Sequence, residues 1–308
     1  MSFDVVVPTI GRASLYTLLN TLANARGQLP GRIILVDDRR DDSELLDRTQ
    51  IDERLRSRVT ILRGKAAGPA AARNTGWRES PAQWIAFLDD DVEVESDWLE
   101  RAAADIADLS QNDAGSQGRL RVPLPEDRAP TDWERNVFGL QSSSWITADM
   151  IYRRSSLEEL GGFDERFRRA YREDAEFALR IFALGYAIRH GSRGVLHPVR
   201  AADPWISIRL QAGNADDMLM YALHGPTWRS LANAPGGRWH YHAVTVLCFT
   251  AWAALTARFA WERIAHGPRT PKEIGTMVAT SAVIPFAAVY HRLRGIAAAA
   301  SILRRPAP

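Results

Sequence analysis

The segment Trp84-Ile-Ala-Phe-Leu-Asp-Asp-Asp-Val92 joins an apolar run to three consecutive carboxylates, Asp89–Asp91. The apolar run predicts a buried strand over Trp84–Asp89. Three adjacent ionised carboxylates are costly to bury unpaired, and a hard divalent cation such as Mg²⁺ or Mn²⁺ would relieve their repulsion. The alternative is an acidic turn that caps a helix beginning near Ser96. Because open parallel sheets bind ligands at the carboxyl ends of their strands, the position favours a ligand site.

Strands and helices alternate on both sides of this segment. The predicted strands are Phe3–Pro8, Arg32–Asp37, Val59–Arg63 and Trp84–Asp89, and the predicted helices are Ser14–Ala25, Ser43–Arg56, Pro69–Glu79 and Ser96–Leu109. Four alternations predict an α/β fold whose mostly parallel sheet is flanked by helices. Beyond residue 113 the pattern is looser. It predicts strands over Gly118–Val122, Trp145–Arg153 and Val195–His197, and helices over Glu173–Leu184 and Trp205–Leu223.

Two shorter motifs also follow predicted strands. Asp37-Asp38 ends the second strand, where a carboxylate can accept from a ribose hydroxyl or a base N–H, although Asx turns are common there too. The run Gly68–Gly76 is rich in small residues and contains Arg73. Small residues allow a helix to approach a ligand or the sheet closely, and Arg73 could then reach a phosphate or base. The alternative is a helix packed tightly on the sheet with Arg73 in solvent.

Composition limits the possible functions. The 308 residues carry a net charge of only +2, which gives no global argument for nucleic-acid binding. The one cysteine, Cys248, leaves no intrachain disulfide, and the N-terminus lacks the pattern of a signal peptide. A cytoplasmic location is expected. No Gly-x4-Gly-Lys-Ser/Thr sequence occurs, so a P-loop nucleotide site is excluded.

The last seventy residues differ from the rest. Ala243–Ala257 and Ile274–Tyr290 contain no charged residue, and Gly295–Leu303 is a shorter apolar run. From Trp239 to the end, eight basic residues stand against two acidic ones, a net charge of +6. Each run alone is shorter than a confident membrane span. The tail is expected to form helices that lie on or dip into the cytoplasmic leaflet, and the alternative is a helical cap on the soluble core.

Six motifs, taken in order, resemble the family 2 glycosyltransferases, whose fold is called GT-A. They cover roughly Phe3 to His197. The motifs are Val7-Pro8-Thr9 with Arg12, Val36-Asp37-Asp38, Ala72-Arg73-Asn74-Thr-Gly76, Leu88-Asp89-Asp90-Asp91-Val92, Leu160-Gly161-Gly162-Phe163-Asp164-Glu165, and Arg172-Glu173-Asp174-Ala-Glu176 with Arg180.

The resemblance implies a role for each matching residue. Those expected at the nucleotide sugar are Pro8, Thr9, Arg12, Asp37, Arg73, Asp89 and Asp90. Asp91 is expected to bind the metal and diphosphate, with His197 as a second metal-side residue, although a lone histidine near a strand end is more often structural. Asp174 is expected to be the general base. The residues expected on the acceptor side are Gly162, Phe163, Asp164, Glu173 and Trp145, the last of which could equally be a core aromatic.

The function expected from this resemblance is metal-dependent, inverting sugar transfer from a nucleotide diphosphate sugar, with UDP-sugars first, to a saccharide or lipid-linked acceptor of the cell envelope. The expected domains are residues 1–235, divided into a nucleotide-binding half (1–113) and an acceptor-binding half (114–235), and a basic apolar tail (236–308). The enzyme would be peripheral on the cytoplasmic face of the membrane. The alternatives are another nucleotide-sugar enzyme, such as a pyrophosphorylase, and a binding protein that has lost catalysis.

Overall fold

The computed structural model describes residues 2–40 and 46–303. It divides into two compact units. The first unit contains residues 1–123 and 141–198, and the second contains residues 124–140 and 199–308. The domain boundary predicted after residue 235 falls inside the second unit and stays a prediction.

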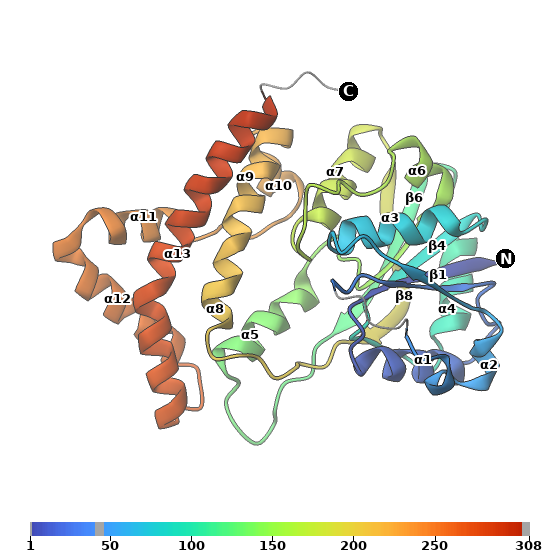
Figure 1. The fold of residues 1–308 in the computed structure, drawn as a ribbon, viewed down its shortest axis with the longest axis horizontal. Coiled ribbons are helices and arrows are strands. Elements are labelled where there is room, and N and C mark those ends of the chain that lie inside the picture. The colour runs from blue at the N-terminus through green and yellow to red at the C-terminus, as the bar shows by residue number, and fades with distance from the viewer. Residues whose placement is uncertain (1, 41–45, 304–308) are drawn as a thin grey trace. The chain divides into compact units, whose positions relative to one another are not determined.

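One eight-stranded sheet forms the centre of the first unit (Figure 1). Its strands are β1 (Phe3–Thr9), β2 (Ile33–Asp37), β3 (Val59–Arg63), β4 (Trp84–Leu88), β5 (Glu93–Val94), β6 (Asp113–Arg121), β7 (Asp149–Arg153) and β8 (Ala187–Leu196). Their order across the sheet is β3-β2-β1-β4-β7-β6-β8-β5. The first four pair in parallel, whereas β7 is antiparallel to both β4 and β6. The predicted mostly parallel sheet is therefore confirmed.

Helices cover both faces of this sheet (Figure 1). They are α1 (Ser14–Asn24), α2 (Glu53–Arg56), α3 (Pro69–Glu79), α4 (Trp98–Ala107), α6 (Arg154–Glu159) and α7 (Glu173–Ala183). On one face, α3 and α7 enclose an aromatic core that includes Phe87, Tyr152, Phe163 and Phe177. The helix α3 approaches the sheet closely because Gly76 has no side chain: a Cβ there would lie 2.4 Å from a Val6 methyl group.

The second unit is helical. It contains α5 (Asp132–Phe138), α8 (Ile206–Arg209), α9 (Gly213–His224), α10 (Trp228–Leu231), α11 (Trp239–Leu247), α12 (Phe249–Ile264) and α13 (Pro271–Leu303). The apolar C-terminal helices expected from the sequence are thus present. The helix α13 joins two of the predicted apolar runs and includes Pro285. Within the described residues, Pro271–Ser301 is the one helix long and apolar enough to cross a membrane, a test that core helices of soluble proteins also pass.

Several predicted boundaries were wrong. The helix predicted over Ser43–Arg56 is replaced, within the described residues, by a short 3-10 turn (Arg48–Gln50) and α2. The carboxylates of Asp47 and Asp52 each accept a hydrogen bond from the backbone N–H two residues later. Each therefore caps the start of a separate short helical turn in place of one continuous helix. The short strand predicted over Val195–His197 is the end of the longer strand β8. The first half of β8 is polar, so a search for apolar runs does not detect it. Residues 43–45 lie outside the described part.

Candidate active site

The carboxyl ends of β1, β2 and β4 meet at one edge of the sheet. Thr9 is paired in register with Asp37, and β1 is also paired in parallel with β4, which ends at Leu88. The acidic triplet begins at the next residue. Thr9 Oγ1 donates a 2.6 Å hydrogen bond to Asp90 Oδ2, which ties the first strand to the triplet. The structure therefore brings the predicted nucleotide-side residues together.

Each carboxylate of the triplet has a basic residue beside it, and Asp91 also lies 3.9 Å from Arg12 Nη1. Asp89 accepts from Arg73 at 2.8 Å, and Asp90 accepts from Arg12 at 2.7 Å. Asp91 lies 3.5 Å from His197 Nε2. Asp90 and Asp91 are buried, and Asp89 is partly exposed. Two arginines of the chain thus already compensate much of the repulsion that the sequence argument assigned to a metal.

Asp91 and His197 meet because β5 pairs antiparallel with β8. Glu93 is opposite Leu196, so the residue after β8 lies beside the residues that precede β5. Ligand atoms about 2.1 Å from one cation lie about 3–4 Å apart, which fits the 3.5 Å between Asp91 Oδ1 and His197 Nε2. Among the residues that the structure describes, no three His, Cys, Asp or Glu side chains are grouped as a metal site. Asp91 and His197 therefore form a pair and not a larger group of these residue types in the part of the chain that the structure describes.

Asp37 and Asp38 differ in their surroundings. Arg39 donates two hydrogen bonds to the fully buried Asp37 carboxylate, at 2.8 and 2.5 Å. Burial alone would raise the pKa of Asp37, but these hydrogen bonds and the nearby Arg63 hold it below its usual range. Asp38 Oδ2 accepts from the backbone N–H of Gly68 at 2.8 Å, immediately before α3. Asp38 therefore orients α3. Pro8, another residue predicted at the nucleotide sugar, is half-buried near the end of β1.

Arg73 connects the triplet to the motif that opens α7. Its guanidinium donates to Glu173 Oε1 at 2.8 Å and to Asp89 Oδ1 at 2.8 Å. Arg73 is 2% exposed, so the alternative of a solvated arginine is wrong. Both terminal nitrogens are used inside the protein, while Arg73 Nε and Glu173 Oε2 are buried without a hydrogen-bond partner among the described residues. Arg73 as a nucleotide contact stays a prediction.

Burial changes the acidity of both carboxyl groups at the start of α7. Desolvation, followed by the negative charge of Asp174, raises the pKa of Glu173 to about 8. Desolvation also raises the pKa of Asp174, to which the charge of Asp89 adds. The helix N-terminus alone would favour the carboxylate of Asp174, so burial outweighs it. A base with a raised pKa binds a proton more strongly, as general-base catalysis requires.

Tyr152 is a nearby residue that the sequence analysis missed. Its hydroxyl group is buried in the aromatic core without a hydrogen-bond partner among the described residues. Desolvation, and then the charge of Asp174, raises its pKa above the ordinary range. The only signal in the sequence is a polar atom within the apolar strand β7. Nothing in a motif distinguished Tyr152 from a core tyrosine.

The loop that contains Gly162, Phe163 and Asp164 is held in place by hydrogen bonds with Asn74 and Arg180. Asn74 accepts from the Phe163 N–H at 2.9 Å and donates to the Phe163 carbonyl at 2.8 Å. Arg180 donates to the Gly162 carbonyl at 2.8 Å. The ring of Phe163 is buried in the aromatic core, and Asp164 is bonded to Arg166. An acceptor contact by the Phe163 ring would therefore require the core to open.

Trp145 has both structural contacts and a polar atom without a partner. Its ring contacts Phe182 edge-on with centroids 4.9 Å apart and stacks on His190 at 6.0 Å. Its backbone has φ of +68°, and its indole N–H is buried without a partner among the described residues. These contacts fit the core alternative, and the acceptor-side role stays a prediction.

Comparison with known proteins identifies the family of proteins to which this fold and site belong. The family model described as Glycosyl transferase family 2 matches residues 4–161, more than half of the 308 residues. The chain therefore belongs to glycosyl transferase family 2. The membership expected from the six motifs is confirmed.

Two curated relatives carry glycosyltransferase names. Pre-mycofactocin glycosyltransferase of Mycobacterium tuberculosis is 30% identical over 137 residues, which cover 40% of this chain and 28% of that protein. Poly(ribitol-phosphate) beta-N-acetylglucosaminyltransferase TarS of Staphylococcus aureus is 30% identical over 108 residues, which cover 34% of this chain and 19% of that protein. The matches span less than a third of the length of either relative.

A solved structure shares the fold along the chain. The crystal structure of S. aureus TarS 1-349 in complex with UDP-GlcNAc has a TM-score of 0.50 and 16% identity, and the match covers 99% of this chain and 92% of that one. At this identity the likeness concerns the fold alone. The expected α/β architecture of the family is thereby confirmed.

Proposed function

We propose that this chain transfers a sugar from a nucleotide diphosphate sugar to an acceptor hydroxyl group with inversion at the anomeric carbon. One observation carries the proposal: in a chain of family 2, Arg73 joins Asp89 of the triplet to Glu173, the neighbour of Asp174. Because one relative is a β-N-acetylglucosaminyltransferase by name, with UDP-GlcNAc in its solved structure, UDP-sugars are the first donors to test.

In the proposed reaction Asp174 removes the proton from the acceptor hydroxyl group. The hydroxyl oxygen forms a bond to the anomeric carbon of the donor, and the bond between that carbon and the diphosphate oxygen breaks. The proton stays on Asp174 and the nucleoside diphosphate leaves with the electron pair. A single displacement inverts the anomeric configuration. The raised pKa of Asp174 makes its carboxylate a stronger base than a solvated aspartate.

The donor would lie over the carboxyl ends of β1, β2 and β4. Thr9, Asp37 and Asp89 are proposed to contact the nucleoside, with Pro8 shaping the floor. Arg12 and Asp90 are joined at 2.7 Å, and they are proposed to order the loop after β1 around the donor. The low pKa of Asp37 keeps this residue an anionic acceptor for ribose hydroxyl groups.

The proposed cofactor is Mn²⁺ or Mg²⁺, held by Asp91 and His197. A bound divalent cation supplies positive charge that stabilises the leaving diphosphate. Mg²⁺ sites commonly use one or two carboxylates together with substrate phosphates and water, so two protein ligands are enough. To bind the cation through Nε2, His197 would carry its proton on Nδ1, which is buried without a hydrogen-bond partner among the described residues.

The acceptor side is proposed to include Gly162, Asp164, Glu173 and Trp145, with a saccharide or lipid-linked acceptor. A role in polysaccharide or glycolipid synthesis at the cytoplasmic face of the membrane is also proposed, and the basic apolar tail supports the membrane location.

The test is nucleotide release. The chain is incubated with UDP-, dTDP- and GDP-sugars and Mn²⁺, alone and with saccharide and lipid-linked acceptors, and the free nucleoside diphosphate is measured. We expect release from one donor class, stimulated by an acceptor and absent from Asp174→Asn. A pyrophosphorylase would instead consume the donor only with added pyrophosphate. A binding protein would show donor affinity without any release, and either result would contradict the proposal.

A further inference from the structure

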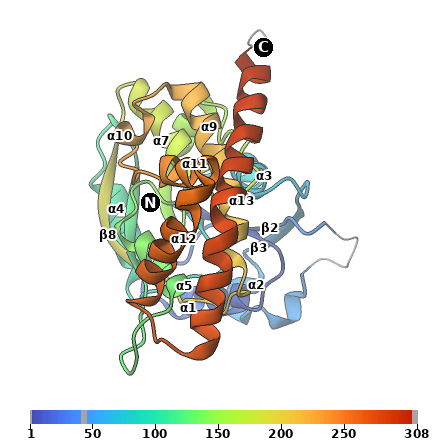
Figure 2. The same cartoon turned by 90° about the vertical axis from the view of Figure 1, so that its left-hand side faces the viewer.

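The helix α13 of the second unit has two faces of opposite kind. Its buried face includes Met277, Ser281, Ile284, Ala288, Gly295 and Ala299, which repeat at intervals of three, four or seven residues. At Gly295 the helix contacts α9 so closely that a Cβ would lie 2.7 Å from the Ala215 Cα. In Figure 2, α13 runs along the outside of the unit next to α11 and α12. The helix therefore packs against α8, α9, α11 and α12 and leaves one face exposed.

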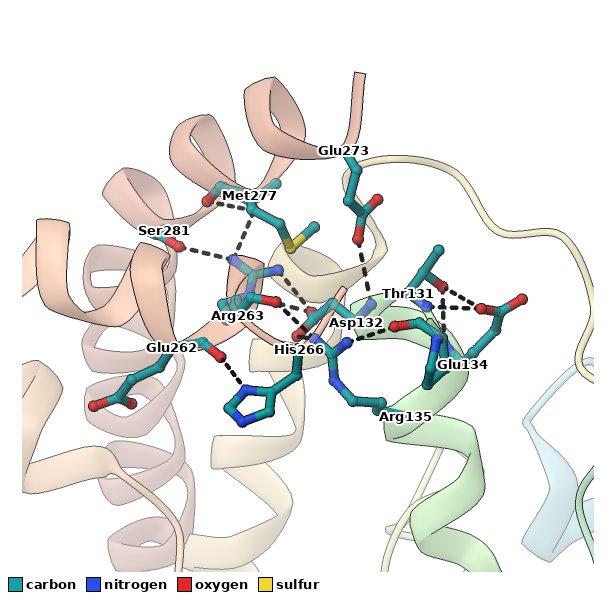
Figure 3. Close-up of polar contacts among 12 residues, drawn as sticks. Thr131, Asp132, Glu134, Arg135, Glu262, Arg263, His266, Glu273, Met277 and Ser281 are labelled. Carbon is teal, nitrogen blue, oxygen red and sulfur yellow. Dashed lines mark hydrogen bonds and ion pairs between the residues drawn. The ribbon is translucent and has the colours of Figure 1, made fainter. Parts of the chain in front are cut away.

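A buried arginine fixes the first third of α13. Arg263 of α12 donates to Thr280 Oγ1 at 2.7 Å and to Ser281 Oγ at 3.0 Å (Figure 3). The same guanidinium is paired with Asp132 of α5 at 2.8 Å. Glu273, near the start of α13, accepts from the Asp132 N–H at 3.3 Å. These contacts hold three helices together through charged groups.

The outer face of α13 is apolar and ends in cations. Val283, Phe286, Tyr290 and Leu293 are 42 to 59% exposed and lie on one face by their helical spacing. Lys272 and Arg294 continue the same face at its two ends and are exposed. We call these six residues the outer stripe. A row of four large apolar side chains in solvent, bounded by cations, resembles an interfacial helix.

We propose that the outer stripe binds the surface of an anionic lipid bilayer, with α13 lying along the interface. Its apolar residues would enter the boundary between head groups and acyl chains, and Lys272 and Arg294 would pair with lipid phosphates. This inference does not depend on which sugar is transferred. It assigns a partner to a surface outside the proposed active site.

The polar contacts argue against α13 crossing the bilayer. A span needs about 20 residues. Any such stretch within Pro271–Ser301 contains either Ser281, bonded to Arg263, or both Arg292 and Arg294. The first option would bring Arg263 and Asp132 into hydrocarbon, and the second would place two arginines there, which is costly in either case.

Charge favours a lipid surface over a second copy of the chain. Two outer stripes brought together antiparallel would juxtapose their own cations, and residues from Trp239 onward carry a net charge of +6. Anionic phospholipids complement that charge. Each cation close to such a surface should raise the affinity for the vesicle about fivefold. The stripe is therefore assigned to lipid.

The experiment is flotation of the full chain with phosphatidylcholine vesicles, with and without phosphatidylglycerol. We expect flotation with phosphatidylglycerol that weakens at high salt. Phe286→Asp with Leu293→Asp should lower vesicle binding at least tenfold, and Lys272→Gln or Arg294→Gln should each lower it about fivefold. Leu184→Asp, an exposed leucine of the first unit, and Arg32→Gln are the matched controls and should bind like wild type.

Circular dichroism, and nucleotide release from the donor in the presence of a soluble acceptor, check that each variant is folded. Equal flotation with neutral vesicles, together with resistance to alkaline carbonate, would mean that α13 spans the bilayer and would overturn the proposal. So would unchanged binding by the double aspartate variant. A salt-insensitive dimer that Phe286→Asp dissociates, without vesicle binding, would assign the stripe to a second copy instead.

Discussion

Arg73 donates a 2.8 Å hydrogen bond to Glu173, a residue one hundred positions later in the chain, from a site that is 2% exposed. Its other terminal nitrogen is bonded to Asp89 at 2.8 Å. The guanidinium thus lies between two carboxylates that belong to different motifs. The proposed metal side and the proposed base side of the active site share this one buried cation.

Loss of this cation should destabilise the protein strongly. Arg73→Met leaves the Asp89 carboxylate and the buried Glu173 carboxyl group without this partner, and removing one member of a buried charged network typically costs about 3–5 kcal/mol. Urea unfolding should show that loss, whereas Arg78→Met, on the exposed side of the same helix, should change stability by less than about 1 kcal/mol. Arg73→Met with Glu173→Met should recover part of the loss. A cost for Arg73→Met as small as that of the control would mean that the pairs contribute little.

Glu173 should make stability depend on pH. Its pKa in the folded chain is about 8, above the value near 4.5 that an exposed glutamate has. The stabilisation from the protonated group is therefore complete below about pH 4.5 and is lost as pH rises through 8. Urea unfolding between pH 5 and 8 measures it, and Glu173→Gln, which mimics the protonated form, should flatten the decline. An equally steep decline in Glu173→Gln would assign the titration to another group.

Two adjacent glycines separate steric cost from conformational cost. Both Gly161 and Gly162 have positive φ, +72° and +84°, so alanine is disfavoured at either position. A Cβ on Gly162 would lie 2.3 Å from Asn74 Oδ1, while a Cβ on Gly161 would meet nothing within 4 Å. We expect Gly161→Ala to cost about 1 kcal/mol and Gly162→Ala clearly more, because the loop must move off Asn74. Equal thermal shifts for the two variants would show that the loop adapts freely.

The strand ends were predictable from sequence because buried parallel strands read as continuous apolar runs. The strands β1 and β4 were recognised in this way, each to within one residue at its end, as was the acidic triplet that follows β4. The helix Pro69–Glu79 was found with its bounds, because Pro69 favours a first helical turn. The polar half of β8 carries no such pattern, and its pairing with β6 appears only in three dimensions.

The partners of the site residues could not be read from the sequence. Compensation of Asp90 by Arg12 requires the loop after β1 to fold back onto β4, and the bond from Arg73 to Glu173 joins distant segments. The triplet alone could not show that two arginines share in neutralising it, and a metal there stays a prediction. Nor could the motif that contains Phe163 show that its ring is buried. The order of the motifs identified the family, but only the packing of the folded chain shows which polar atoms of the site lack a partner.

Metal dependence should distinguish Asp91 and His197 from other polar residues. Asp91→Asn and His197→Ala should each raise the half-saturating Mn²⁺ concentration for donor turnover by at least about 10–100-fold, the loss typical when an outer-shell partner of a metal is changed. Asp108→Asn, an exposed aspartate at the end of α4, is the control and should leave it unchanged. Turnover that resists chelation by EDTA in the wild-type chain would contradict a metal at this position.

The most direct test of the account is the effect of Asp174→Asn on two quantities measured in parallel. Calorimetry with Mn²⁺ gives donor affinity, and turnover with a working acceptor gives the rate. If Asp174 is the general base, donor affinity should stay nearly unchanged while turnover falls by about 10²–10⁴. Asp91→Asn, by contrast, should weaken donor binding as well as turnover. Near-normal turnover in Asp174→Asn would contradict the account and would move the base to another acid, with Glu173 or Glu176 the next to test.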